Sequence, residues 1–263
     1  TLSVWLVKAG INRSTVTLFS WAGFAYAFKY LWSPLVDNYR LPIFKKLGHR
    51  KSWLLLAQIF IIFALILTSF TDPQKNLLYT AFFITLLAFF SSTQDIIIDA
   101  FRIESAPQSL QGPLSSMYIS GYRVAMLVAG AGSLWLAAFF GTDIYNQNVW
   151  KKVYLIMAFL MFIGIIATIF SDEPRIKKKF KSQNHSSFLI AILISLIGFL
   201  YLYSLLQNPY MEDNLFLSFI FSVLRLLVCF VFSFLIIKFL ILNKFVSKDK
   251  IIKSYFNPIK NFL

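Results

Sequence analysis

The sequence predicts an all-α integral membrane protein, and three observations lead to that class. Hydrophobic residues make up 58% of the 263 residues, and mean hydropathy is +0.70. Charged residues make up only 14%, whereas soluble domains carry about 25%. The apolar residues also lie in long runs, each close to the roughly 20 residues that a helix needs to cross a bilayer.

Seven apolar runs are long enough to be membrane spans, and we expect one helix from each. They cover residues 14–35, 53–71, 77–101, 113–140, 150–171, 188–206 and 216–242. We divide the chain into a helix bundle (1–174), a basic cytoplasmic linker (175–187), two accessory helices (188–243) and a cytoplasmic amphipathic tail (244–263). The opening TLSVWL reads as the end of a helix, so we expect most of a first helix to be missing.

The basic residues give an orientation. The net charge of +14 could suggest nucleic acid, but Lys and Arg lie in short loops between spans, which indicates a membrane surface and no nucleic-acid partner. Loops 37–52, 102–112 and 172–187 and the tail hold 16 of the 25 basic residues. Cytoplasmic loops of membrane proteins carry an excess of Lys and Arg, so we place these segments in the cytoplasm.

Four stretches carry a family resemblance. The first cytoplasmic loop resembles the hallmark G-x-L-x-D-x-x-G-R-K of the major facilitator superfamily, with a serine for the first glycine and about eight extra residues between its halves. Its matching residues are Ser33, Leu35, Asp37, Gly48, Arg50 and Lys51. With it, four stretches resemble AmpG-type muropeptide permeases of that superfamily: FKYLWSPLVD (28–37), GHRKSWLLLAQ (48–58), STQDIIIDAFR (92–102) followed by Glu104 and Pro107, and GYRVAMLVAG (121–130).

The resemblance implies a fold and a function. The fold would be the N-terminal six-helix half, with its first helix mostly missing, plus two extra transmembrane helices. The function would be proton-coupled import of muropeptides (N-acetylglucosaminyl-anhydro-N-acetylmuramyl peptides) across the bacterial inner membrane. The implied partners are an anionic muropeptide, protons, the lipid bilayer and, if encoded separately, a C-terminal half. No nucleotide-binding motif occurs, and we expect no cofactor.

Ionisable residues inside the spans are the candidate cavity site. Asp95, Asp99 and Arg102 fall within about 60° of one another on a helix. Asp95 lies ~9 Å inside the span, Lys29 is at matched depth on another span, and Arg123 is near the midplane. Such groups are costly in a bilayer and should be paired. The triad Lys29, Asp95 and Arg123 therefore either couples protons to an acidic substrate or is a permanent cluster that fixes helix packing.

The residues nearer the cytoplasmic surface are candidates for a gate. Asp99 and Arg102 could form a simple ion pair at a helix end. Alternatively, they belong to a latch that joins Asp37 and Asp99 through Arg50, Lys51 or Arg102, a role that comes from the family resemblance. A third pattern, the small residues Gly121, Ala125, Ala129, Ser133 and Ala137, predicts a face for close helix packing.

Several alternatives remain beside the transporter half. The chain could be a non-functional or regulatory remnant of a split or degraded transporter gene, or an importer of another anionic metabolite such as a CoA ester. A membrane enzyme that uses Asp95 and Asp99 is disfavoured, because both carboxylates come from one helix and no second acidic motif occurs. We expect no metal site, because neither histidine has a second ligand at suitable spacing.

Overall fold

The computed structural model divides into two compact units, residues 1–179 and 180–263. It describes the chain except residues 42–46, 142–144, 175–185, 207–214, 244 and 246–263. All regular elements in the described part are helices, which confirms the predicted class. Most of the predicted linker and nearly all of the predicted tail lie outside the described residues. Five of the described helices are long and apolar enough to cross a bilayer, so the chain is a multi-pass membrane protein.

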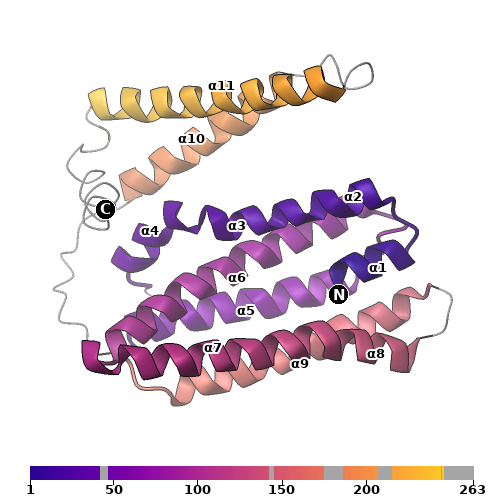
Figure 1. The fold of residues 1–263 in the computed structure, drawn as a ribbon. Coiled ribbons are helices and arrows are strands. Elements are labelled where there is room, and N and C mark those ends of the chain that lie inside the picture. The colour runs from indigo at the N-terminus through magenta and orange to yellow at the C-terminus, as the bar shows by residue number, and fades with distance from the viewer. Residues whose placement is uncertain (42–46, 142–144, 175–185, 207–214, 244, 246–263) are drawn as a thin grey trace. The chain divides into compact units, whose positions relative to one another are not determined.

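The first predicted span is not one regular helix. Five short helical pieces follow one another, and the last of them, α4, bends away from the line of the others (Figure 1). They are α2 (Arg13–Leu18), η1 (Phe19–Gly23), α3 (Phe24–Ala27), η2 (Lys29–Leu31) and α4 (Ser33–Asn38). Pro34 at the start of α4 has no amide hydrogen to donate, and the η pieces are tighter 3₁₀ turns. The prediction of a continuous α-helix over residues 14–35 was therefore wrong.

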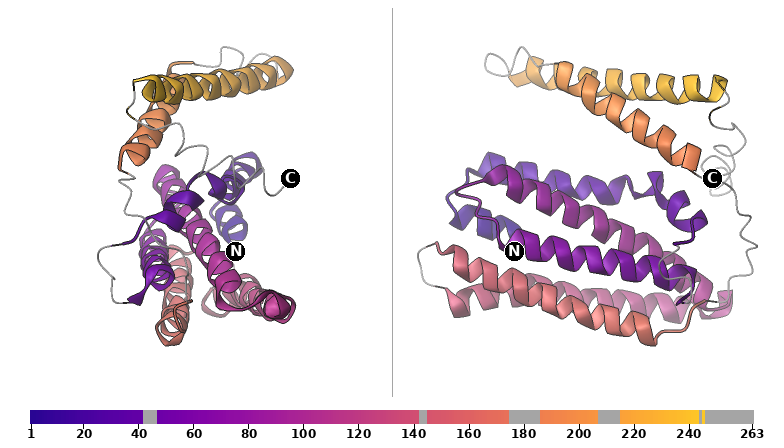
Figure 2. Two further views of the ribbon diagram at one scale, coloured as in Figure 1. Left: turned by 90° about the vertical axis from the view of Figure 1, so that its left-hand side faces the viewer. Right: turned by 180° about the vertical axis from the view of Figure 1, so that it is seen from behind.

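Three long helices form the centre of the first unit. They are α5 (His49–Ser69), α6 (Leu77–Ser105) and α9 (Gln147–Phe170), and α5 lies between the other two (Figures 1 and 2). The side chain of Asn76 accepts a hydrogen bond from the amide of Tyr79 at the start of α6, and Asn146 accepts one from the amide of Asn148 at the start of α9. Such caps satisfy amides that have no partner within the helix.

The fourth predicted span contains a break of a different kind. It is formed by α7 (Gln111–Leu127), a π-helical turn η5 (Val128–Gly132) and α8 (Ser133–Phe140). The π turn has the sequence VAGAG, and glycine weakens regular α-helix. Single π turns inside α-helices are rare and are frequent at functional sites.

Two apolar clusters hold the first unit together at opposite ends. At the outer end, Trp5 of α1 (Leu2–Lys8) is fully buried, with its ring 6.1 Å from that of Trp150 and 5.0 Å from that of Tyr154. At the end that loop charge predicts to face the cytoplasm, Val36 packs with Leu54 of α5 and Ile97 of α6. The broken helix is therefore anchored where it approaches the cytoplasm.

The outer loops are joined by a polar cluster. The Tyr145 hydroxyl donates to Asp72 at 2.9 Å, which links the loop before α9 to the loop before α6. Burial, and then the hydrogen bond to Asp72, raise the pKa of Tyr145 above its ordinary value. The phenol therefore stays neutral across the physiological range.

The second unit is a helical hairpin of α10 (Ser186–Leu205) and α11 (Leu215–Leu242). Ser195 and Ser233 each donate from their hydroxyl to the other's carbonyl, at 3.3 and 3.1 Å. Arg225 donates from Nε to the Tyr203 carbonyl at 3.0 Å and lies 3.6 Å above the Tyr203 ring. A cation inside this hairpin is thus satisfied by the neighbouring helix.

Candidate functional site

An ion cluster lies within the membrane-spanning part of the first unit. The Lys29 ammonium is 2.5 Å from Asp95 Oδ2 and 3.5 Å from Asp99 Oδ2. All three side chains are about one-third exposed. Asp95 and Asp99 are four residues apart, so α6 presents both carboxylates on one face, and the broken helix supplies one ammonium to them. Two carboxylates therefore share a single lysine.

The sequence did not identify Tyr118 of α7 as a member of this cluster. Its hydroxyl donates to Asp95 Oδ1 at 3.2 Å, so each oxygen of Asp95 has one donor. Arg102 lies 5.2 Å from the centre of the Tyr118 ring, donates to Ser115 at 2.5 Å and is 3.8 Å from Asp99. A tyrosine in a membrane helix gives little sign of its role, because the sequence does not show which group its hydroxyl binds.

The structure corrects the predicted place of Arg123. We expected Arg123 beside Asp95, but its side chain is exposed and makes no ion pair with a described acidic residue. Tyr118 and Arg123 are five residues apart, which separates them by about 140° around the helix. Because Tyr118 faces Asp95, Arg123 points elsewhere.

A second ionic cluster lies around Arg50, at the helix ends that loop charge predicts to face the cytoplasm. Arg50 is nearly fully buried, and all three of its guanidinium nitrogens are used. Nε and Nη2 donate to the two oxygens of Glu104 at 2.8 and 2.7 Å, and Nη1 donates to Asp37 at 2.6 Å. The guanidinium thus joins α4, α5 and α6.

This cluster differs from the predicted latch. Asp37 and Arg50 do meet, but Glu104 takes the place that we assigned to Asp99, which pairs with Lys29 instead. Arg102 contacts Asp99 and Ser115, not Asp37. The cause is depth: Asp99 lies more than one helical turn from Glu104 along α6, out of reach of Arg50.

Lys51 binds backbone carbonyls and not the carboxylates of the predicted latch. Its ammonium donates to the carbonyls of Ile169 and Ser171 at 2.9 and 2.8 Å, at the end of α9. In return, Glu173 accepts from the amides of Arg50 and Lys51 at 2.7 and 3.0 Å, at the start of α5. Each helix end therefore receives the charge that its dipole favours. In the sequence, Glu173 stands out only as an acidic residue just before a basic stretch, and this did not predict its contact with α5.

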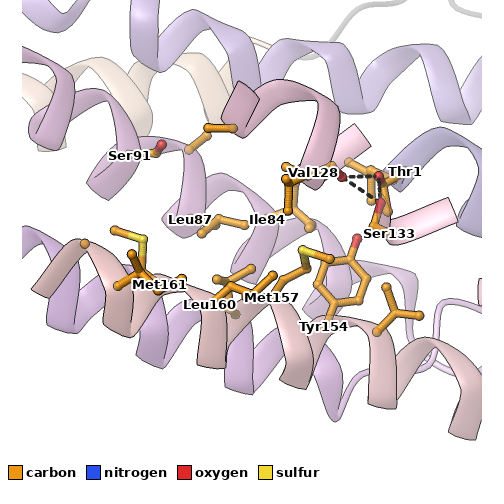
Figure 3. A pocket seen from close by; sticks show the side chains of 18 of the residues that line it. Thr1, Ile84, Leu87, Ser91, Val128, Ser133, Tyr154, Met157, Leu160 and Met161 are labelled. Atoms are coloured by element: carbon orange, nitrogen blue, oxygen red, sulfur yellow. Dashed lines mark hydrogen bonds between the residues drawn. The ribbon is translucent and has the colours of Figure 1, made fainter. Parts of the chain in front are cut away.

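A cavity of about 930 Å³ opens between α6, α7 and α9. Its wall is mostly apolar, with Leu87, Met157 and Leu160 among the side chains drawn in Figure 3. Ser91 lies at one side and Thr1 and Ser133 lie together at another. Ser91 accepts from the Tyr26 hydroxyl at 2.7 Å and is one turn before Asp95, so the cavity ends beside the ion cluster.

The small-residue face of α7 and α8 lines this cavity. Gly121, Ala125, Ala129 and Ser133 are part of its wall, whereas Ala137 packs in the outer apolar cluster. Apart from its chain neighbours and the backbone of its own helix, no atom lies within 4 Å of where a Cβ would sit on Gly121. The predicted close helix packing is therefore absent from the described residues along most of this face. The described residues also contain no group of three or more His, Cys, Asp or Glu that could hold a metal.

Comparison with known proteins identifies the family. The model of the Major Facilitator Superfamily matches residues 7–252, nearly the whole chain. The chain belongs to the major facilitator superfamily. No solved structure matches it.

Three relatives in this superfamily are AmpG proteins or a permease. AmpG 4 of Rickettsia felis is 37% identical over 194 residues, which are 73% of this chain and 45% of that protein. AmpG 3 of Rickettsia prowazekii is 36% identical over 186 residues, 70% of this chain and 42% of that protein. The anhydromuropeptide permease of Escherichia coli K12 is 38% identical over 174 residues, 66% and 33% of the two chains. The similarity confirms the AmpG-type resemblance, and the chain spans less than half the length of these relatives.

Proposed function

We propose that the chain acts as half of a proton-coupled secondary transporter that imports anhydromuropeptides across the bacterial inner membrane. The superfamily and the permease among the relatives support transport rather than catalysis. The observation that carries the proposal is the cluster of Lys29, Asp95 and Asp99 inside the membrane-spanning part. Ionisable groups at that depth cost roughly 2.5–3.5 kcal/mol each and mark ion and substrate paths.

Proton coupling follows from the charge count of the cluster. Lys29 and Arg102 face the carboxylates of Asp95 and Asp99, so the four groups carry no net charge when all are ionised. A proton on Asp95 leaves one net positive charge and weakens the hold of Asp95 on Lys29. The ammonium is then available to Asp99 or to an anion that enters from the cavity beside Ser91 and Tyr26. Proton and anionic substrate would thus be bound together.

Muropeptides suit such a site because they carry carboxylates on a polar sugar and peptide frame. Arg123 is exposed on α7, where it is free to contribute a second positive charge to a substrate path completed by another half. In this superfamily the path lies between two halves that rock against each other. A separately made C-terminal half is therefore the partner that the proposal requires.

The test is uptake of radiolabelled anhydromuropeptide by right-side-out membrane vesicles with acid outside. The vesicles come from an Escherichia coli strain without its own permease, with the chain expressed alone and together with the C-terminal half of that permease. We expect gradient-driven uptake from the pair, and at least a tenfold loss in Asp95→Asn.

The matched control is Asp172→Asn, an exposed acid in a cytoplasmic loop, which should leave uptake unchanged. Wild-type uptake in Asp95→Asn would remove the coupling role of Asp95. Absence of uptake both from the chain alone and from the chain with the C-terminal half would reject the proposed function.

A further inference from the structure

Tyr118 lies at a boundary in the packing of α7. In the first two turns of this helix, four residues are half-buried: Gln111, Leu114, Ser115 and Tyr118. Their spacing places them on one side of the helix. From Ile119 to Ala129 every residue is exposed, and the cavity takes the place of contact with α6. Tyr118 is therefore the last residue that packs α7 on α6 before the two helices separate.

Polar side chains make this attachment. Gln111 donates to the carbonyls of Ile103 and Ala106 at 3.1 and 2.8 Å, and Ser115 accepts from Arg102 at 2.5 Å. Both contacts lie at the cytoplasmic end of α6. Tyr118 makes the innermost contact, and its partner is the carboxylate of Asp95 at 3.2 Å. The depth of the α6–α7 contact thus depends on a group that can take up a proton.

We propose that Tyr118 is a positioning residue that makes the packing of α7 on α6 depend on the protonation of Asp95. The inference rests on the proposed function, in which Asp95 is the coupling carboxylate. A hydrogen bond to an ionised carboxylate is roughly twice as strong as one between neutral groups. Protonation of Asp95 therefore weakens the Tyr118 contact and the Lys29 contact in one step, and loosens α7 from α6.

The other charged and titratable groups around Asp95 support this direction. Lys29, on η2, keeps a second carboxylate, Asp99, at 3.5 Å, so it has a partner after Asp95 is neutralised. Arg102 of α6 stays bound to Ser115 and above the Tyr118 ring, which holds the cytoplasmic end of α7 in place. Tyr26 of α3, the remaining group near Asp95, is engaged by Ser91. Release at Tyr118 would thus move the outer part of α7 and leave its start fixed.

The experiment measures the distance between α6 and α7 by electron spin resonance. Spin labels are placed at Phe82→Cys on α6 and Leu127→Cys on α7, both exposed positions, in a Cys229→Ser background in lipid nanodiscs. With falling pH, we expect a second, longer distance population to replace the first. Asp95→Asn and Tyr118→Phe should each show the longer population at every pH.

Tyr122→Phe is the matched control, because Tyr122 is one turn further along α7 and exposed, and it should titrate like the parent protein. If Tyr118→Phe perturbs folding, the double variant Asp95→Asn/Tyr118→Phe still tests the proposal. Both changes remove the same contact, so the double variant should contain no more of the longer distance population than either single variant. Normal titration in Tyr118→Phe, additive effects in the double variant, or no pH response in the parent protein would each overturn the proposal.

Failure of this inference can be distinguished from failure of the proposed function. If the α6–α7 distance responds to pH through Tyr118 but Asp95→Asn leaves uptake unchanged, the transport role of Asp95 is wrong and the positioning role of Tyr118 is supported. If uptake needs Asp95 but the distance does not respond, the positioning role falls alone.

Discussion

Arg50 shows how much one side chain can organise at the cytoplasmic ends of the helices. A guanidinium has a planar fork of donors that matches a carboxylate, and here it binds Glu104 with two bonds and Asp37 with a third. Lysine could supply the charge but not this geometry. The loop motif that contains Arg50 predicted its importance, whereas the pairing of Glu104 with Arg50 came only from the folded structure.

Replacing Arg50 by methionine should destabilise the first unit. The change leaves two partly exposed carboxylates without their partner, and hydrogen bonds to charged groups contribute about 1.5–3 kcal/mol. The measurement is the free energy of unfolding in mixed micelles. Arg13→Met, at an exposed arginine at the start of α2, is the control and should be close to neutral. Equal stability of the two variants would show that the cluster around Arg50 contributes little.

Gly48 is a second residue whose identity the fold requires. Its backbone has φ 97° and ψ 176°, a region that essentially only glycine adopts, and a Cβ there would lie 2.3 Å from Cδ of Glu173. Gly48→Ala should lower the free energy of unfolding by at least about 1–3 kcal/mol from the backbone alone. The same micelle measurement applies. Gly112→Ala has open space around the new methyl group and should change stability by no more than about 1 kcal/mol.

At the scale of elements, hydrogen bonds join the start of α5 to the end of α9. Glu173, beyond the end of α9, accepts from the first amides of α5, and Lys51 of α5 donates to the last carbonyls of α9. Within the spans, Gln58 and Thr168 add a buried hydrogen bond of 2.9 Å. This pair of helices is therefore joined at its ends and within the spans, while α7 is attached to α6 by a few polar side chains.

Neutralising Glu173 should loosen the start of α5. Hydrogen bonds to a charged group contribute about 1.5–3 kcal/mol and neutral ones about 0.5–1.5, so Glu173→Gln should speed hydrogen exchange of the Arg50 and Lys51 amides about tenfold. Exchange is followed by mass spectrometry on peptides from the start of α5. Asp172→Asn, at the neighbouring acid, should leave it unchanged. Unchanged exchange in Glu173→Gln would mean that these amides do not depend on the cap.

At the scale of the whole molecule, the placement of charge gives the chain one orientation. The clusters around Arg50 and Lys51 lie at the helix ends whose loops are rich in Lys and Arg. The cluster of Asp72 and Tyr145 lies at the other ends, beside loops with few basic residues. The positive-inside rule therefore puts the Arg50 cluster in the cytoplasm.

This orientation can be measured with single cysteines in a Cys229→Ser background. Lys75→Cys lies in the exposed loop before α6 and Gln108→Cys in the exposed loop before α7. In intact cells, a membrane-impermeant maleimide should label Lys75→Cys and leave Gln108→Cys unlabelled until the membrane is opened. The reverse pattern would invert the topology and contradict the proposed cytoplasmic latch.

Much of this protein follows from its sequence alone, because the bilayer leaves few choices. Backbone groups in hydrocarbon must bond internally, so long apolar runs become helices, and basic loops fix their direction. The pairing of Lys29 with Asp95 could also be anticipated, since both lie at the same depth on helices that turn toward each other.

The tertiary structure decided which side chains of neighbouring helices meet. Rotation about each helix axis, which the sequence leaves open, turned Tyr118 rather than Arg123 toward Asp95 and left the small-residue face on a cavity. Depth along α6 gave Glu104 rather than Asp99 to Arg50. Apolar residues surround a membrane helix on every side and so do not specify its rotation, whereas a few polar contacts between helices do.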